Sequence, residues 1–134
     1  MDQLFNKFKT NKITHMSTLT NIEINPQSFV ESNKIEWQQM AEGVKRKILS
    51  YDENLMMVRV DFEKGAIGAL HQHRHIQITN IESGSFEVEI GGVKKVLNAG
   101  DVFYVHSNVI HGVVCLEKGV LIDVFNPMRE DFFQ

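Results

Sequence analysis

The chain contains 134 residues, of which 43% are hydrophobic, and its 14 Lys and Arg against 17 Asp and Glu give a net charge of −3. This length suits one domain with its own apolar core. The composition is that of a globular protein rather than of a disordered segment. The acidic balance argues against nucleic acid as a partner, because nucleic-acid binding requires a basic surface.

Nothing in the sequence predicts a membrane partner or an oxidising compartment. No run of about 18 apolar residues is present to span a bilayer, and the first residues lack the apolar core of a signal peptide. The single cysteine, Cys115, cannot form an internal disulfide. We therefore expect a cytoplasmic protein.

The N-terminal part of the chain is weakly patterned. We expect residues 1–20 to form a poorly structured N-terminal arm, in which His15 is incidental. Residues 21–134 then form a single domain, because no repeat, linker or low-complexity tract divides them. Near the start of this domain, Ser32–Met40 is expected to include a short helical turn around Trp37.

The rest of the chain alternates apolar and polar residues in short runs, which is typical of half-buried strands. Met56, Val58 and Phe62 share one side of such a run, and Gly91-Gly92 supplies a tight hairpin turn. Strands are predicted at residues 44–49, 56–62, 76–83, 86–90, 93–97, 102–105, 112–116 and 120–125, with turns at 84–85, 98–101 and 117–119. This pattern predicts an all-β antiparallel sandwich or barrel.

Histidine is the unusual residue of the composition, because five of the six histidines lie between positions 71 and 111. His71, His73 and Gln77 have the same parity, so a regular strand would point them to one side, and His111 can join them from a later strand. Three imidazoles and an amide oxygen suit a borderline divalent ion such as Zn, Ni, Fe, Co or Mn. A His-x-His pair alone is weak evidence for such a site.

The residues around these histidines strengthen the metal hypothesis. The stretches Gly65-x5-His71-x-His73-x3-Gln77-x6-Gly84 and Asn98-x-Gly100-Asp101-x4-His106-x4-His111 resemble the two motifs of the cupin superfamily, G-x5-H-x-H-x3/4-E-x6-G and P-x-G-D-x4-P-x4-H. The resemblance implies an antiparallel jelly-roll barrel (a double-stranded β-helix), commonly dimeric. It also implies one divalent metal ion, held by His71, His73, Gln77 and His111. Gln77 replaces the usual Glu, and Asn98 and His106 replace the two prolines.

A narrower resemblance covers roughly residues 30–133. The stretch from Glu42 to Ala66, the His-x-His-x-His-x-Gln variant and the ending from Ile122 to Phe133 are similar to small pectin-degradation cupins. Those proteins ketonise unsaturated uronates. The resemblance implies conversion of a 4,5-unsaturated uronate monosaccharide, released from pectin or alginate, to linear 5-keto-4-deoxyuronate. The expected partners are therefore a small anionic sugar and a second copy of the chain.

Such a reaction needs a proton-transfer group and a cation for the uronate carboxylate, and the ending of the chain offers both. Asp123 lies in an apolar run, where an unpaired carboxylate is costly unless it is functional. If its side faces the cavity, Asp123 is the general acid or base and Phe125 packs against the sugar. Arg129 is the carboxylate clamp, and the resemblance places active-site roles on these same three residues. The alternatives are structural: an Asp123–Arg129 pair, a core Phe125, or a surface Arg129.

Two other function classes remain open, namely an iron-dependent cupin dioxygenase and a non-enzymatic cupin that binds a sugar or metal. His75 is expected to face outward or to support a ligand, and His106 to lie in a solvated loop. Trp37 and the Met56–Met57 pair are interpreted as packing residues. The run Lys45-Arg46-Lys47 is interpreted as a solvated strand edge.

Overall fold

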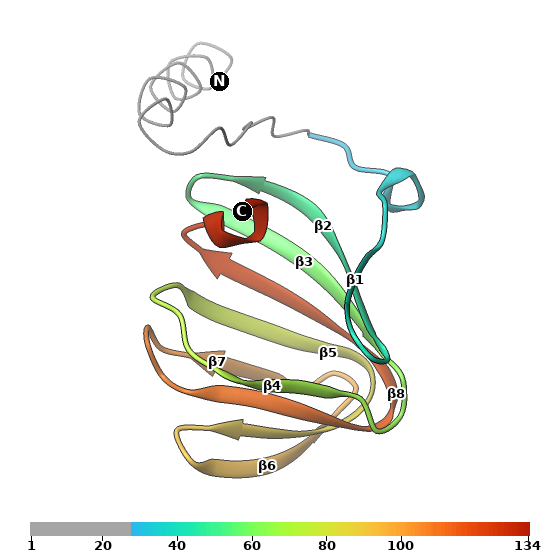
Figure 1. The fold of residues 1–134 in the computed structure, drawn as a ribbon, viewed down its shortest axis with the longest axis vertical. Coiled ribbons are helices and arrows are strands. Elements are labelled where there is room, and N and C mark those ends of the chain that lie inside the picture. Colours follow the sequence, from blue (N-terminus) through green and yellow to red (C-terminus); the bar gives the residue numbers. More distant parts are fainter. Residues whose placement is uncertain (1–27) are drawn as a thin grey trace.

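A computed structural model describes residues 28–134, which form an antiparallel sheet rolled into a barrel (Figure 1). In chain order the strands are β1 (Gln38–Ala41), β2 (Val44–Asp52), β3 (Leu55–Phe62), β4 (Ile67–His71), β5 (Ile76–Ile90), β6 (Val93–Asn98), β7 (Val102–Val105) and β8 (His111–Asn126). Two short 3-10 turns, η1 (Ser32–Lys34) and η2 (Glu130–Phe133), flank them. The all-β antiparallel jelly roll expected from the sequence is confirmed.

The sheet is organised around its two longest strands, β5 and β8. The hydrogen-bonded order is β1-β2-β3-β8-β5-β6, while β4 pairs with β8 and β7 pairs with β5. Consequently β5 and β8 pass through both halves of the barrel, and every other strand except β1 and β2 is paired directly to one of them. These two strands determine which side chains face the interior.

The turns predicted at residues 84–85 and 117–119 are wrong, because β5 and β8 bend there without leaving the sheet. The pairing register shifts between Ile81 and Phe86, as in a β-bulge. Gly84 has φ +83°, and a Cβ there would lie 2.6 Å from the carbonyl oxygens of Glu117 and Lys118. A Cβ at Gly119 would likewise overlap the carbonyl oxygen of Ser83. The bend therefore depends on two glycines that let the backbones cross closely.

Two further expectations are corrected at the N-terminal side of the domain. Within Ser32–Met40, only residues 32–34 form a helical turn, and β1 begins at Gln38. Pairing with β2 satisfies the backbone of this segment, which overrides its local helical pattern. As a result β2 is paired on both sides, with β1 and β3, so Lys45-Arg46-Lys47 is not a strand edge. The expected arm over residues 1–20, with His15, lies outside the described residues.

The interior divides into two apolar clusters. The larger cluster includes Phe62, Ile81, Phe86, Phe103, Val105, Cys115 and Leu121. The smaller contains Met56, Val58, Phe125 and Met128. Met56 is fully buried and Met57 is 41% exposed, so only one of the pair belongs to the core. Trp37 lies outside the barrel, where the ammonium groups of Lys45 and Lys47 are 4.2 and 4.5 Å from its ring centroid. Within residues 28–134, no helix is long and apolar enough to cross a membrane.

The glycine at the bend of β5 gives a stability prediction with a matched control. Gly84 and Gly92 both have φ +83°, but nothing lies within 4 Å of a Cβ built at Gly92. Both Gly84→Ala and Gly92→Ala should lose about 1–2 kcal/mol for the left-handed backbone. Gly84→Ala should lose about 1–3 kcal/mol more, because its Cβ meets backbone carbonyls. Urea unfolding measures both variants, and equal losses would contradict the close-crossing argument.

Candidate metal centre and active site

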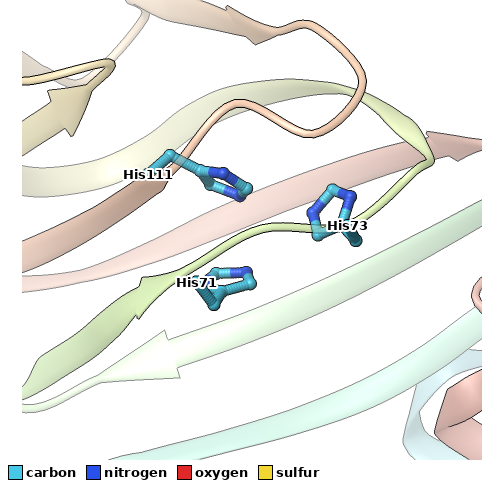
Figure 2. A group of neighbouring side chains, drawn as sticks. All are labelled: His71, His73 and His111. Atoms are coloured by element: carbon cyan, nitrogen blue, oxygen red, sulfur yellow. The ribbon is translucent and has the colours of Figure 1, made fainter.

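Three histidines converge at one end of the barrel. His71 ends β4 and pairs directly with His111, which begins β8, while His73 lies in the loop between β4 and β5. Ring centroids are 4.3 Å apart for His71 and His111, and 4.9 Å apart for His73 and His111. One ligand nitrogen of each ring lies within 4.8 Å of the others. Figure 2 shows the three rings gathered around a common space.

The three imidazoles are held in the same tautomer. Each Nδ1 donates a hydrogen bond to a backbone carbonyl two residues away, which assigns its proton because a carbonyl oxygen only accepts. The pairs are His71 to Ala69 (2.8 Å), His73 to His75 (2.9 Å) and His111 to Val109 (2.8 Å). In the neutral ring this leaves the lone pair on Nε2, which is the state that a metal ligand requires.

Gln77 completes a donor set that fits a cation. Its Oε1 lies 3.1 Å from Nε2 of His73, while its amide group donates to the hydroxyl of Thr79 at 2.8 Å. Two acceptors thus face each other, since neither His73 Nε2 nor Gln77 Oε1 carries a proton. Nε2 of His111 is buried and has no hydrogen-bond partner within residues 28–134. A divalent ion bound by these atoms would satisfy both observations.

The protonation of the histidines favours metal binding at neutral pH. Burial, assisted by the charges of Arg129 and His111, lowers the pKa of His73 to about 4. Burial also lowers the pKa of His111. Both rings are consequently neutral near pH 7, so a metal ion does not have to displace protons from them.

A cavity of about 210 Å³ adjoins the histidines and lies where the two apolar clusters meet. Its wall includes His71, Gln77, His111, Asp123, Phe125 and Arg129. A larger hollow of about 610 Å³ lies near Phe29 and Tyr51 on the outside and contains no histidine. The smaller cavity is therefore the candidate site, because it combines the donor set with a carboxylate and a guanidinium.

Asp123 faces the cavity from the middle of β8. It pairs with Thr79 across the sheet, and its Oδ1 accepts hydrogen bonds from the Thr79 hydroxyl at 2.6 Å and the Gln77 amide at 3.4 Å. Burial raises its pKa to about 6, although both hydrogen bonds and the charge of Arg129 act in the opposite direction. A carboxyl group with this pKa exchanges a proton readily near neutral pH.

Arg129 is buried at the rim of the same cavity rather than exposed at the surface. Its Nε and Nη2 donate to the carboxylate of Asp131 at 3.0 and 2.8 Å. Its guanidinium carbon lies 5.1 Å from the ring centroid of Phe125. Phe125 is 2% exposed and packs edge-on against His73, with the centroids 5.6 Å apart. The structure thus brings together all seven residues singled out from the sequence.

Comparison with known proteins places the chain in a family. The Cupin domain family matches residues 58–125, which contain the whole donor set. The chain is a cupin. The pectin degradation protein KdgF of Dickeya dadantii (strain 3937) is 51% identical over 98 residues, covering 72% of this cupin and 89% of that protein. At this identity and coverage, the chain belongs to the same branch of cupins.

Solved structures agree with this assignment. An RmlC-like cupin from Shewanella frigidimarina NCIMB 400 superposes with a TM-score of 0.77 at 44% identity, covering 79% of this cupin and 96% of that chain. KdgF from Halomonas sp. superposes with a TM-score of 0.76 at 41% identity, covering 79% and 98%. An oxalate decarboxylase of Bacillus subtilis is 22% identical with a TM-score of 0.68, which shows the fold alone.

A contact between the C-terminal turn and the loop between β4 and β5 supports the site of this cupin. Glu130 accepts a hydrogen bond from Arg74 at 2.8 Å and lies 2.9 Å from Nε2 of His75. The carbonyl of His75 in turn orients His73. We name Arg74, His75 and Glu130 the C-terminal latch. His75 is therefore buried beside His73, whereas His106 is exposed and packs edge-on against Tyr104.

Some site residues were not identified from the sequence. Thr79 holds Asp123, and Arg46 and Phe132 line the cavity. Thr79 is two residues from Gln77, and Arg46 is two residues from Val44. Strand alternation therefore predicts that each faces the interior with its partner. Phe132 had no such signal, because it belongs to a terminal turn that folds back over the barrel.

The donor set gives a prediction about metal content. His111→Ala should weaken the binding of a divalent ion by at least about tenfold. Losing a group that only supports a ligand already weakens metal affinity by about that much, and this variant removes a ligand itself. His106→Ala serves as the control, since its ring lies outside the cavity and should leave binding unchanged. Dialysis against Ni, Zn, Fe, Mn or Co followed by elemental analysis measures both. Equal metal content in the two variants would contradict the site.

Proposed function

We propose that this cupin ketonises 4,5-unsaturated uronate monosaccharides from pectin or alginate breakdown, giving linear 5-keto-4-deoxyuronate. The observation that carries the proposal is one cavity in which the donor set, the carboxylate of Asp123 and the guanidinium of Arg129 meet. The 51% identity to a protein named for pectin degradation supports the substrate class. The proposed reaction is therefore an isomerase-like proton transfer that depends on a metal ion.

The chemistry requires no oxidant. Ring opening converts the 4,5-unsaturated uronate to a linear enol, with the hydroxyl on C5 and the double bond between C4 and C5. Ketonisation removes the proton from that hydroxyl and adds a proton to C4, so that C5 becomes a carbonyl and the atoms balance. One divalent ion held by His71, His73, Gln77 and His111 would supply Lewis-acid polarisation of the substrate oxygens.

Asp123 is the group that we assign to the proton transfer. Thr79 and Gln77 hold its Oδ1, and within residues 28–134 no hydrogen bond engages its Oδ2. One oxygen is thereby fixed while the other is available to the substrate. The raised pKa, about 6, lets the group both accept and deliver a proton near neutral pH.

Arg129 and Phe125 are assigned to substrate binding. Arg129 is held by Asp131 through Nε and Nη2, which leaves Nη1 for the uronate carboxylate. Phe125 forms an apolar wall between His73 and the guanidinium, where it excludes water from the reacting carbons. A neutral donor set beside a guanidinium favours an anionic sugar over a neutral one.

The proposal is tested with a monouronate freshly produced by a lyase. The metal-loaded protein should accelerate the loss of the ultraviolet absorbance of the double bond above the spontaneous rate, and a chelator should abolish the acceleration. An unchanged rate with metal bound would contradict the proposal. Oxygen consumption with iron would instead indicate the dioxygenase, and calorimetric sugar binding without turnover would indicate a non-enzymatic cupin.

Asp123→Asn separates catalysis from folding. We expect it to lower turnover by about 10²–10⁴-fold while metal content stays unchanged. Folding raises the pKa of Asp123 from 3.8 to about 6, so ionisation of this group lowers the free energy of unfolding. The decrease is complete above pH 6 and absent below about pH 4. The variant should therefore gain up to about 3 kcal/mol in unfolding free energy at pH 7.5 and nothing at pH 4. Retained turnover would remove the proton-transfer role.

A homodimer is part of the proposal. Met57, Val124, Ile78 and Tyr104 are direct neighbours across β3, β8, β5 and β7. Met57, Ile78 and Tyr104 are 41%, 50% and 42% exposed, so the outer face carries an apolar row that a second copy would bury. Light scattering should give the mass of a dimer, and Ile78→Asp should give a monomer. A monomeric wild type would refute this part alone.

A cytoplasmic location is proposed as well. Cys115 is buried and unpaired, and burial raises the pKa of its thiol, so the core needs no disulfide and does not depend on an oxidising compartment. The substrate, a small anionic sugar, calls for neither nucleic acid nor membrane as a partner.

A further inference from the structure

Arg46 is a second guanidinium that enters the site. Alternation along β2 places Lys45 and Lys47 on the outer face of the sheet beside Trp37, where Lys47 is buried and donates to the carbonyl of Ser32. Arg46 instead lines the cavity that contains the donor set and Asp123. The central residue of a basic run is thus separated from its neighbours by the pleat of the strand. Its role differs from the solvated one expected from the sequence.

Two contacts hold the Arg46 side chain in place. Its Nε donates a hydrogen bond of 2.8 Å to Oε1 of Gln38 on the neighbouring strand β1. Its guanidinium carbon lies 3.7 Å from the ring centroid of Phe132, and that of Arg129 lies 4.4 Å from the same centroid. Phe132 therefore carries both cations at the mouth of one cavity.

The terminal amino groups of Arg46 are not consumed by the protein. Within residues 28–134, no hydrogen bond or ion pair engages its Nη1 or Nη2, whereas Arg129 is already bound through two nitrogens to Asp131. Burial and the neighbouring charge of Arg129 lower the pKa of Arg46, because the two guanidiniums repel each other. Asp131 binds Arg129, and Asp123 accepts hydrogen bonds from Thr79 and Gln77, so no carboxylate within residues 28–134 pairs with Arg46. A free guanidinium edge has the geometry that a carboxylate accepts in bidentate form.

We propose that Arg46 is a substrate-binding residue that donates hydrogen bonds from Nη1 and Nη2 to the carboxylate of the uronate. This inference rests on the proposed function and deepens it, because it assigns the anionic end of the sugar to the open edge of Arg46. Arg129 contributes its remaining nitrogen to the same carboxylate. Gln38 and Phe132 are the positioning residues of Arg46, since they hold its Nε and its flat face.

The test compares Arg46→Gln, Arg46→Lys and Arg59→Gln in the full chain loaded with metal. Arg59 is the matched control, because it lies on the adjacent strand β3 but binds Asp61 at 2.8 Å near Trp37 on the outside. We expect Arg46→Gln to raise the KM for the unsaturated monouronate by about tenfold or more with a smaller change in kcat. Arg46→Lys should be intermediate, since it keeps the charge but loses the fork. Arg59→Gln should match the wild type.

A second measurement does not depend on turnover. Calorimetry with galacturonate, which has the carboxylate but no double bond to ketonise, should show binding that Arg46→Gln weakens by about tenfold and Arg59→Gln leaves unchanged. Galactose, the neutral analogue, should bind the wild type and Arg46→Gln equally weakly. Thermal unfolding and metal content confirm that each variant is folded and loaded.

The outcomes separate the two proposals. A wild type without turnover would refute the ketonisation, while galacturonate binding lost only in Arg46→Gln would still support Arg46 as the anion-binding residue. A KM and a galacturonate affinity within twofold of the wild type in Arg46→Gln would overturn the inference and leave the ketonisation standing. Absence of galacturonate binding to an active wild type, with an unchanged KM in the variant, would also overturn it.

Discussion

The site depends on the antiparallel register between β5 and β8. This register sets Gln77 opposite Phe125 and Thr79 opposite Asp123, and at the far end it sets Ile90 opposite His111. Because side chains alternate with a period of two, a slip by one residue would turn the interior residues outward. The positions of Gln77, His111, Asp123 and Phe125 are therefore consequences of one ladder, which His71 joins through the pairing of β4 with β8. The glycine crossing at Gly84 keeps that ladder continuous through the bend.

The polar groups of the cavity oppose folding more than they assist it. Ionised Asp123 is desolvated, and Arg46 and Arg129 approach one aromatic ring although their charges repel each other. The surrounding apolar clusters and the C-terminal latch hold these groups in position. Such a combination of strained electrostatics and a rigid frame is typical of a binding or catalytic site.

Period-two patterning and motif spacing predicted most of the fold and the donor set. Met56, Val58 and Phe62 are buried as their alternation predicts, and the expected donor atoms of His71, His73, Gln77 and His111 lie close together. The same local rules failed where a distant segment decides the outcome. Gly84 marks a bend only because β8 crosses beside it, and Lys45-Arg46-Lys47 is not a strand edge only because β1 pairs with β2.

The C-terminal latch could not be predicted from local sequence patterns, because it also depends on a distant segment. Its members Arg74 and Glu130 are 56 residues apart in sequence, and nothing in either neighbourhood specifies the other. Phe132 likewise acquires its position from the fold-back of the final turn. Hydrophobic periodicity predicts strands and their buried faces, but it does not predict which distant residues a terminal segment contacts.

The neutral donor set has a consequence for encounter with the substrate. Imidazoles that bind through Nε2 and the Gln77 amide would contribute no charge, so a bound divalent ion would keep its double charge. The carboxylates of Asp123 and Asp131 would offset the two guanidiniums and leave the site positive. The outside of the protein is acidic, with a net charge of −3 for the whole chain. Most of the surface would thus repel an approaching anion weakly, while the mouth of the cavity would attract it. The electrostatic field would therefore steer the anion toward the site. Capture of the sugar would then slow as ionic strength rises.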